Sequence, residues 1–152
     1  MNKVAIVMGS AKDQTKMQAA GDILTRFGVE YDVRVLSAHK SPDAAFEFAA
    51  TAADHGFSVI IAGAGKAAHL AGVMAAKSLL PVIGVPLSAS LQGLDALLAT
   101  VQMPTGIPVA TVAVDGSANA ALLAVAILAL HDEELARKLA EYRDELAEQT
   151  LG

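Results

Sequence analysis

The sequence predicts a single α/β domain built on a parallel sheet that helices cover on both faces. Three short apolar runs, 4–8, 31–36 and 59–62, each lead into a turn of small residues and then into a segment of helical periodicity. Continuous apolar strands of this kind require cover on both faces of the sheet. The chain has 152 residues, the usual length of one domain.

Turn residues mark the starts of the predicted helices. Asp13 can cap a first helix that runs to about Phe27. Pro42 occupies a first-turn position of the second helix, and Gly65-Lys66 leads into the third. Together with the apolar runs, these signals describe a βαβ rhythm, which is typical of a doubly wound sheet.

The second half of the chain completes the predicted sheet. Two more strands are expected at 82–85 and 109–114, with a helix at 91–101 and an ordered loop at 103–108 between them. Segment 118–130 is rich in Ala and Leu on nearly every helical face. We therefore expect it to form a helix that is buried on all sides.

The last predicted helix, 132–149, is amphipathic and forms a C-terminal extension of domain 1–152. Leu135, Leu139, Tyr142 and Leu146 form one apolar seam, and charged residues fill the rest. The helix could pack on its own domain or dock as an arm on a neighbouring subunit. We favour the arm, because a closed domain leaves a terminal helix little to cover.

Composition limits the class of protein. The chain has no cysteine, which excludes thiolate zinc sites, disulfides and cysteine nucleophiles and fits a cytoplasmic protein best. The run 4–8 reaches Gly9 too soon for a signal peptide, and the longest apolar stretches, 79–87 and 118–130, are shorter than a bilayer span. We expect no membrane crossing.

Charge indicates the kind of partner. The formal net charge of −5 argues against nucleic-acid binding, although local cations could still hold a small anion. Between residues 57 and 130 the formally charged side chains are Lys66, Lys77, Asp95 and Asp115 alone. Because soluble monomers seldom expose so much apolar surface, this segment predicts a homo-oligomer.

Three turns should converge on one ligand site, because ligands of doubly wound sheets bind outside the carboxyl ends of the strands. Each turn supplies small residues, backbone N–H groups at a helix start, and a cation. The turns are 9–13, 37–42 and 63–70, and the cations are Lys12, Lys40 and Lys66. Together they predict an anion pocket.

Individual side chains of these turns suit a nucleotide monophosphate. Asp13 is an acceptor for ribose hydroxyls, and Ser10 and Ser37 suit phosphate or carboxylate oxygens. His39 and His69 each follow a strand in a loop of small residues, which favours a functional role. The alternatives are that Asp13 serves only as a cap and that the lysines are only solvated.

Other chemistries fit less well. Two histidines from separate loops lack a third zinc ligand at a recognisable spacing, so we expect no metal. Gly9-Ser10 lacks the flanking pattern of a nucleophile elbow, and no carboxylate is evidently placed to orient a catalytic histidine. A serine hydrolase is therefore not predicted.

A series of motifs covers nearly the whole chain in order. The motifs are VMGS, SAH, GAG, AAHL, GVP, GLD, VQMP, GIPV and NAALL, at residues 7–10, 37–39, 63–65, 67–70, 84–86, 93–95, 101–104, 106–109 and 119–123. The series resembles the 5-(carboxyamino)imidazole ribonucleotide mutase and aminoimidazole ribonucleotide carboxylase family of purine biosynthesis. The resemblance implies a flavodoxin-like three-layer fold, an octamer, active sites completed across subunit interfaces, and a C-terminal helix that reaches a neighbour.

The resemblance also implies roles for residues. His39 would be the general acid/base, Asp13 would hold the ribose and Lys40 the phosphate, while His69 would line the imidazole and carboxylate end. The full implied substrate-binding set is Gly9, Ser10, Lys12, Asp13, Ser37, Ala38, Lys40, Gly63, Ala64, Gly65, Lys66, His69 and Leu70. The reaction requires no metal or organic cofactor, and segment 87–91 could act as a lid that retains CO2.

The sequence departs from the family pattern in the predicted pocket. Lys12 stands where the family usually has Ser, Lys40 where the mutase branch usually has Arg, and Lys66 where it usually has Gly. Lysine in place of arginine keeps the charge but loses the bidentate fork. Outside these turns, Ala71 replaces a usual Pro, and segment 87–91 is a residue shorter than in many mutases.

Several activities remain open at this point. The Ser-Ala-His-Lys turn at 37–40 fits the sister activity, carboxylation of aminoimidazole ribonucleotide by CO2, whereas 63–65 and 67–70 fit the mutase better. A paralogue could act on another carboxylated nucleotide, with Lys66 binding the extra carboxylate. A non-catalytic nucleotide-binding module is the last alternative, against which the presence of His39 argues.

Overall fold

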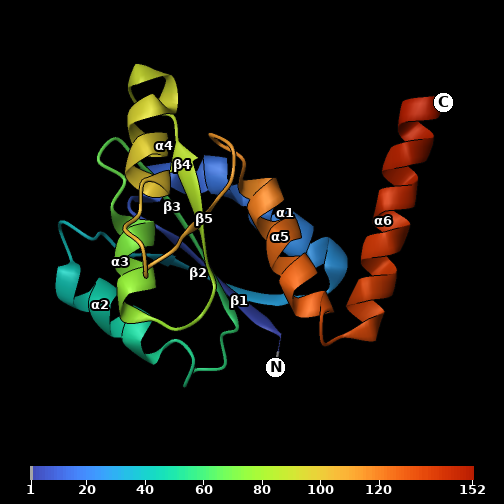
Figure 1. Ribbon diagram of the computed structural model, residues 1–152, viewed down its shortest axis with the longest axis horizontal. Helices are drawn as coiled ribbons and strands as arrows, with labels where there is room; N and C mark the ends of the chain where they lie inside the picture. Colours follow the sequence, from blue (N-terminus) through green and yellow to red (C-terminus); the bar gives the residue numbers. More distant parts are fainter. Residues whose placement is uncertain (1) are drawn as a thin grey trace.

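The computed structural model describes residues 2–152 and shows a five-stranded parallel sheet of strand order β2-β1-β3-β4-β5 with helices on both faces (Figure 1). The strands are β1 Lys3–Met8, β2 Glu30–Val35, β3 Val59–Gly65, β4 Val82–Leu87 and β5 Ala110–Thr111. The predicted doubly wound, three-layer α/β fold is therefore confirmed.

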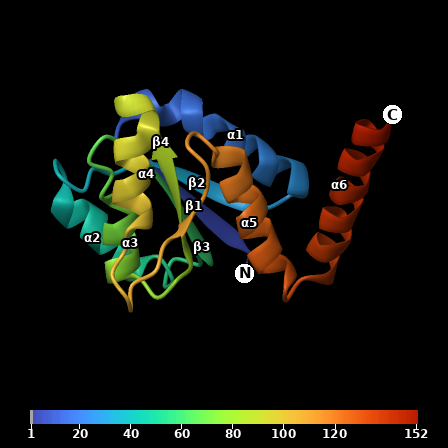
Figure 2. The same cartoon turned by 45° about the horizontal axis from the view of Figure 1, so that its top comes forward.

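Two helical layers enclose the sheet. The α-helices are α1 Gln14–Phe27, α2 Pro42–Thr51, α3 Leu70–Lys77, α4 Leu94–Val101, α5 Ser117–Ala129 and α6 Glu133–Leu151, and short 3₁₀ turns η1 (Ala11–Asp13) and η2 (Leu91–Gly93) precede α1 and α4. Helices α1 and α5 cover one face, and α2 and α3 cover the other (Figures 1 and 2). Among residues 2–152, no helix is both long enough and apolar enough to span a membrane.

The central strands divide their side chains between two cores. Val4, Ile6 and Met8 of β1 face α1 and α5, whereas Ala5 and Val7 face α2 and α3. Strand β4 is buried throughout, and β3 is buried as far as Gly63. This burial on both faces explains their continuous apolar sequence.

The edge strands differ from the prediction. In β2, Val33 is 40% exposed and Val35 is 51% exposed, because this strand pairs with β1 alone and forms one edge of the sheet. Strand β5 has two residues instead of the six expected at 109–114. Pro86 of β4 faces β5 and has no N–H to donate, so the ladder cannot continue there.

The helix starts agree with the turn signals except at Asp13. Pro42 is the first residue of α2, as predicted. The Ser10 hydroxyl, however, accepts the capping bond from the Lys12 N–H at 3.2 Å, and the Asp13 side chain makes no capping hydrogen bond. Asp13 thus holds the predicted N-cap position of α1, but its side chain does not make the capping bond, and it lines the pocket instead.

Helix α5 is less buried in this chain than predicted. One face packs on α1 and the sheet, but Leu123 is 37% exposed and Leu130, just after the helix, is 77% exposed. The expectation of burial on all sides is wrong for the isolated chain, because its helical neighbours, α1 and α6, cover only part of its circumference.

Helix α6 packs on its own domain over its first half. Leu135 is buried, and the Tyr142 ring lies 5.6 Å from that of Phe27 between ring centroids. Leu146 is 42% exposed, and the C-terminal end of α6 projects away from the sheet (Figures 1 and 2). The first half of α6 thus packs on its own domain. Docking of the second half on a neighbouring subunit stays a prediction.

Candidate active site

A pocket of about 620 Å³ lies at the carboxyl ends of β1, β3 and β4, where the three predicted turns meet. Every predicted site residue except Gly63 lines it. The lining residues are Gly9, Ser10, Lys12, Asp13, Lys16, Ser37, Ala38, His39, Lys40, Ala64, Gly65, Lys66, Ala67, His69, Leu70, Ser88 and Ala89. The three predicted turns therefore meet at one pocket outside the carboxyl ends of the strands.

Gly63 lies one layer beneath the pocket. A Cβ at this position would meet the Met17 sulfur at 2.5 Å, so Met17 covers this glycine from α1. Its carbonyl accepts the Gly9 N–H at 3.2 Å, which ties β3 to the first turn. Gly63 is therefore not among the residues that line the pocket, and its role in the site stays a prediction.

His39 and His69 form a direct pair across the pocket. His39 Nε2 lies 2.8 Å from His69 Nδ1, and the two rings meet edge to face at 83° with centroids 4.9 Å apart. One of the two nitrogens must carry the proton and the other must accept it. The turn before α2 and the start of α3 thus share one proton at the pocket surface.

The turn that carries His39 is fixed by its own hydrogen bonds. The Ser41 hydroxyl accepts the Ser37 N–H at 3.0 Å, and the Ser37 hydroxyl accepts the Lys40 N–H at 3.0 Å. Because Ser37 uses its oxygen as an acceptor, its O–H remains a donor toward the pocket. This turn therefore presents a hydroxyl donor, the cation of Lys40 and an imidazole together.

The first turn contributes an acceptor of unusual pKa. Burial raises the pKa of Asp13, while a backbone hydrogen bond at Ser10 and the charge of Lys16 act in the opposite direction. A carboxylate that is partly desolvated gains when a ligand hydroxyl donates to it. Asp13 is thus chemically suited to hold a ribose diol.

The third turn brings Lys66 to the pocket in a strained conformation. Its φ is +54°, in the left-handed region that glycine occupies at little cost. The pKa of Asp95 is lowered, first because Ser90 donates a hydrogen bond to it and to a lesser degree by the charge of Lys66. The Lys66 charge therefore acts on a carboxylate at the start of α4.

Four lining residues were not predicted as site residues: Lys16, Ala67, Ser88 and Ala89. Lys16 lies one turn after Asp13 on α1, a spacing that places both on one helix face and could have indicated it. Ser88 directly follows β4, so applying the strand-end rule to that strand would have found it. Ala67 belongs to a turn already identified.

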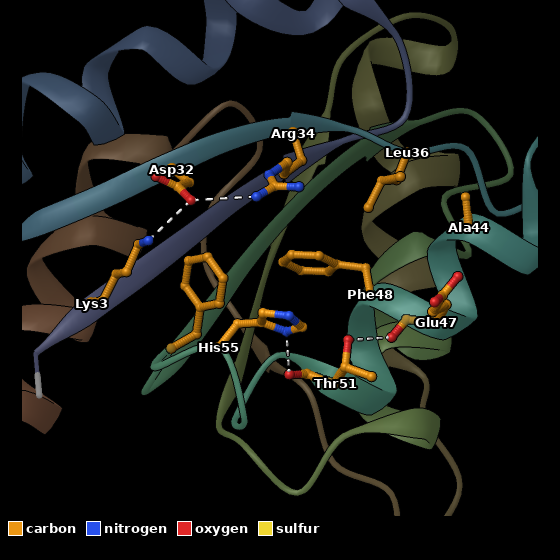
Figure 3. Close-up of a pocket in the computed structure, with 10 residues that line it drawn as sticks. Lys3, Asp32, Arg34, Leu36, Ala44, Glu47, Phe48, Thr51 and His55 are labelled. Carbon is orange, nitrogen blue, oxygen red and sulfur yellow. Dashed lines mark hydrogen bonds and ion pairs between the residues drawn. The ribbon is translucent and has the colours of Figure 1, made fainter.

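A second hollow lies between β2 and α2 on another part of the molecule (Figure 3). Three of its charged residues are paired with one another, since Asp32 lies 3.1 Å from Lys3 and 3.5 Å from Arg34, measured between carboxylate oxygen and side-chain nitrogen. Lys3 is at the amino end of β1, away from the strand ends that position ligands. This hollow has no histidine pair, and we do not assign it a catalytic role.

The charged groups of the structure also bear on metal binding. Residues 2–152 contain no cluster of three or more His, Cys, Asp or Glu side chains arranged to hold a metal ion.

Comparison with known proteins places this geometry in a family. Residues 3–149 match the family model described as AIR carboxylase. An N5-carboxyaminoimidazole ribonucleotide mutase of Pyrococcus abyssi is 53% identical over 96% of this chain and 84% of its own length. The enzyme of the same name from Escherichia coli K12 is 53% identical over 98% of this chain and 90% of its own length.

Solved structures agree with this relationship. The crystal structure of a single-site variant of Treponema denticola PurE2 superposes with a TM-score of 0.89 at 30% identity, covering 98% of this chain and 93% of that one. The match is as extensive for the structure of Treponema denticola PurE, with a TM-score of 0.87. With its motifs, its fold and its pocket all accounted for by one relationship, the chain belongs to the AIR carboxylase family.

Proposed function

We propose that this chain is a mutase that converts 5-(carboxyamino)imidazole ribonucleotide into 4-carboxy-5-aminoimidazole ribonucleotide in purine biosynthesis. Its relatives at about half identity over nearly the full length carry the name N5-carboxyaminoimidazole ribonucleotide mutase. The single observation that carries the proposal is the His39–His69 pair, hydrogen-bonded at 2.8 Å within a pocket that the predicted site residues line.

The ribonucleotide is held by the three turns. Asp13 accepts hydrogen bonds from the ribose hydroxyls, and Lys40, with Ser10 and Ser37 beside it, binds the phosphate. Lys12 adds a second cation to the pocket lining. The imidazole then lies toward His39 and His69, with the backbone of β3 beneath it.

Carboxyl transfer needs one proton carrier and no cofactor. His39 donates a proton to the exocyclic nitrogen as the carbamate C–N bond breaks and CO2 leaves. The electron-rich ring carbon attacks the CO2, and His39 recovers a proton when that carbon loses its hydrogen. Protons therefore balance over the cycle, and an imidazole side chain can both give and take one.

The pairing with His69 supports this role for His39. Because the two rings share one proton, His69 fixes the orientation of the His39 imidazole and stabilises its charged form when it takes up the second proton. His69 thereby lines the imidazole end and assists through His39.

The alternative activity is carboxylation of aminoimidazole ribonucleotide by CO2. Lys40 favours this activity, because the Ser-Ala-His-Lys turn occurs in the carboxylase branch of the family.

The test that distinguishes the two activities is the ultraviolet absorbance change with freshly made 5-(carboxyamino)imidazole ribonucleotide, beside a run with aminoimidazole ribonucleotide and bicarbonate. Conversion of the first alone supports the mutase. Product only in the second would favour the carboxylase, and no conversion in either would point to another carboxylated nucleotide or to a binding module.

His39 provides the residue-level check. His39→Asn is expected to lower kcat by about 10²–10⁴-fold, the usual contribution of a general acid/base, while nucleotide affinity by calorimetry changes little. His55→Asn is the matched control, because His55 lies outside the pocket and bonds to Thr51 at the end of α2. A His39→Asn enzyme of near wild-type rate would remove His39 from the mechanism.

We also propose that the chain works as a cytoplasmic homo-octamer without nucleic-acid or membrane partners. The net charge of −5 supports the absence of a nucleic-acid partner. The exposed apolar residues of α4 and the projecting end of α6 supply surface for subunit contacts. In this assembly domain 1–152 is one unit, and α6 is the arm that docks on a neighbouring subunit.

A further inference from the structure

Ser88, the first residue after β4, is held at the pocket by partners from two distant parts of the chain. Its N–H donates to Asp115 Oδ1 at 2.9 Å, and its hydroxyl donates to Asp115 Oδ2. The Lys16 ammonium donates to the Ser88 carbonyl and lies 3.3 Å from its hydroxyl oxygen. Every polar group of Ser88 is therefore engaged.

Asp115 reaches Ser88 from a loop that the backbone fixes independently. Its N–H donates to the Pro86 carbonyl at 2.8 Å, and its φ is +58°. The side chain itself is exposed and outside the pocket lining. The carboxylate thus contributes little to the core, and both of its oxygens are used on Ser88.

Lys16 is equally well anchored, from the opposite side. The buried Ser117 hydroxyl donates to the Lys16 carbonyl at 2.7 Å, which ties α1 to the start of α5. Lys16 thus reaches Ser88 from α1, whereas Asp115 reaches it from the loop after β5.

We propose that Asp115 and Lys16 are positioning residues that clamp Ser88, so that segment 88–90 closes the pocket and retains CO2 between its release and its recapture. The proposal rests on the mutase function and deepens it. Ser88 and Ala89 line the pocket, and a Cβ on Gly65 would meet Ala89 Cβ at 3.1 Å, so the segment lies directly on the third turn. Asp115 acts through Ser88 and need not touch the substrate.

The left-handed backbone at Asp115 allows a variant that separates positioning from folding. Glycine adopts φ near +58° without strain, so Asp115→Gly removes the carboxylate while the loop keeps its conformation. Asp115→Asn keeps an acceptor for the Ser88 N–H but loses the charge. Asp22→Asn is the control, because Asp22 is an exposed carboxylate of α1 whose partner is Gln18.

Retention of the carboxyl group is the deciding measurement. Substrate labelled with ¹⁴C in its carboxyl group is converted in unlabelled bicarbonate, and the label kept in the carboxylated product is compared with total turnover. Asp115→Gly is expected to lower kcat/KM by about tenfold or more and to retain at least about twofold less label than wild type, because CO2 escapes from an open pocket. The label retention and kcat/KM of Asp115→Asn should fall between those of Asp115→Gly and those of wild type. Asp22→Asn should match wild type in both.

Two further readouts distinguish positioning from a merely structural role. Asp115→Gly should still unfold in one cooperative urea transition, and the Ser88 amide should exchange faster with deuterium, because it has lost its acceptor. The double variant Ser88→Ala with Asp115→Gly should lose less kcat/KM than the product of the fold-losses of the two single variants, since Asp115 acts through Ser88.

The outcomes separate the two proposals. Wild type that converts 5-(carboxyamino)imidazole ribonucleotide, together with an Asp115→Gly variant of unchanged label retention and kcat/KM, overturns the clamp alone. Wild type that converts neither substrate overturns the mutase function and the clamp that rests on it. Label loss in an Asp115→Gly variant that still unfolds cooperatively in urea supports both.

Discussion

The carboxylate of Asp13 lies where function and stability oppose each other. Burial raises its pKa above the ordinary 3.8, so ionised Asp13 destabilises the folded chain at neutral pH. When folding raises the pKa of a carboxyl group, its ionisation lowers the stability of the fold at pH values above the folded pKa. At pH values below the unfolded pKa of 3.8 the group is protonated in both states and has no such effect. Asp13→Asn is therefore expected to raise the free energy of unfolding at pH 7 and to weaken nucleotide binding.

The check on Asp13 is urea unfolding of both forms as a function of pH. The stability difference between Asp13→Asn and wild type should shrink as pH falls through the folded pKa of Asp13 toward 3.8. Calorimetry with the nucleotide should show the opposite order of the two forms in affinity. A variant of wild-type affinity would place the ribose elsewhere.

Lys66 presents a similar conflict in its backbone. A non-glycine residue at φ near +54° costs about 1–2 kcal/mol, and glycine recovers this less its own entropic cost of about 0.5–1 kcal/mol. Lys66→Gly should thus raise the free energy of unfolding by up to about 1.5 kcal/mol. Mutase activity should persist, because the family that the sequence resembles usually has glycine here.

Gln92→Gly is the matched control for Lys66, since Gln92 has φ +56° and lies outside the pocket lining. It should show the same gain in urea unfolding with no change in kcat or KM. If Lys66→Gly abolishes turnover while Gln92→Gly does not, Lys66 binds a group of the substrate.

Single residues show which site features sequence could reveal. The turns that follow β1, β2 and β3 identified nearly all of the pocket, because small residues and cations after an apolar strand are visible in sequence. Burial of Gly63 beneath Met17 and the Ser88–Asp115 contact could not be predicted, since each depends on packing between segments far apart in the chain.

At the scale of elements, α6 has two halves with different roles. Leu135 is buried against the core, so Leu135→Ala is expected to reduce the free energy of unfolding by about 2 kcal/mol or more. Leu146 is 42% exposed on the projecting half, and Leu146→Ala should cost the folded subunit less than about 0.5 kcal/mol. Chemical denaturation of both variants checks this contrast.

The same pair of variants tests the proposed arm. If the projecting half of α6 docks on a neighbouring subunit, Leu146→Ala weakens subunit association even though each subunit stays folded. Equal destabilisation by the two variants, with no effect on association, would show that the whole helix serves its own domain.

Elements were predictable where local signals and tertiary packing agree. Pro42 begins α2, and the apolar runs of β1, β3 and β4 coincide with buried strands. The prediction for 109–114 failed because the missing N–H of Pro86, on the partner strand, ends the β5 ladder early. The sequence of α5 is apolar on nearly every helical face, so it has no hydrophobic periodicity. It therefore could not show which face of α5 stays exposed in this chain.

At the scale of the whole molecule, surface area is the informative quantity. A compact monomer of 15.5 kDa is expected to expose about 7,200 Å². This chain exposes 8135 Å², and its exposed large apolar residues include three on one side of α4, namely Leu94, Leu98 and Val101. Surplus surface with an apolar stripe is typical of a subunit whose remaining contacts come from other copies.

The α4 stripe gives the prediction that decides this point. Leu98 is 49% exposed, so Leu98→Glu should leave the folding of a lone subunit nearly unchanged, but a charge placed in a subunit interface would be desolvated at high cost. We expect light scattering at micromolar concentration to give an oligomer for wild type and a smaller mass for Leu98→Glu. Val35→Glu, on edge strand β2 and 51% exposed, is the control for added charge. A monomeric wild type would contradict the proposed octamer, whereas an oligomer that Leu98→Glu leaves intact would move the interface away from α4.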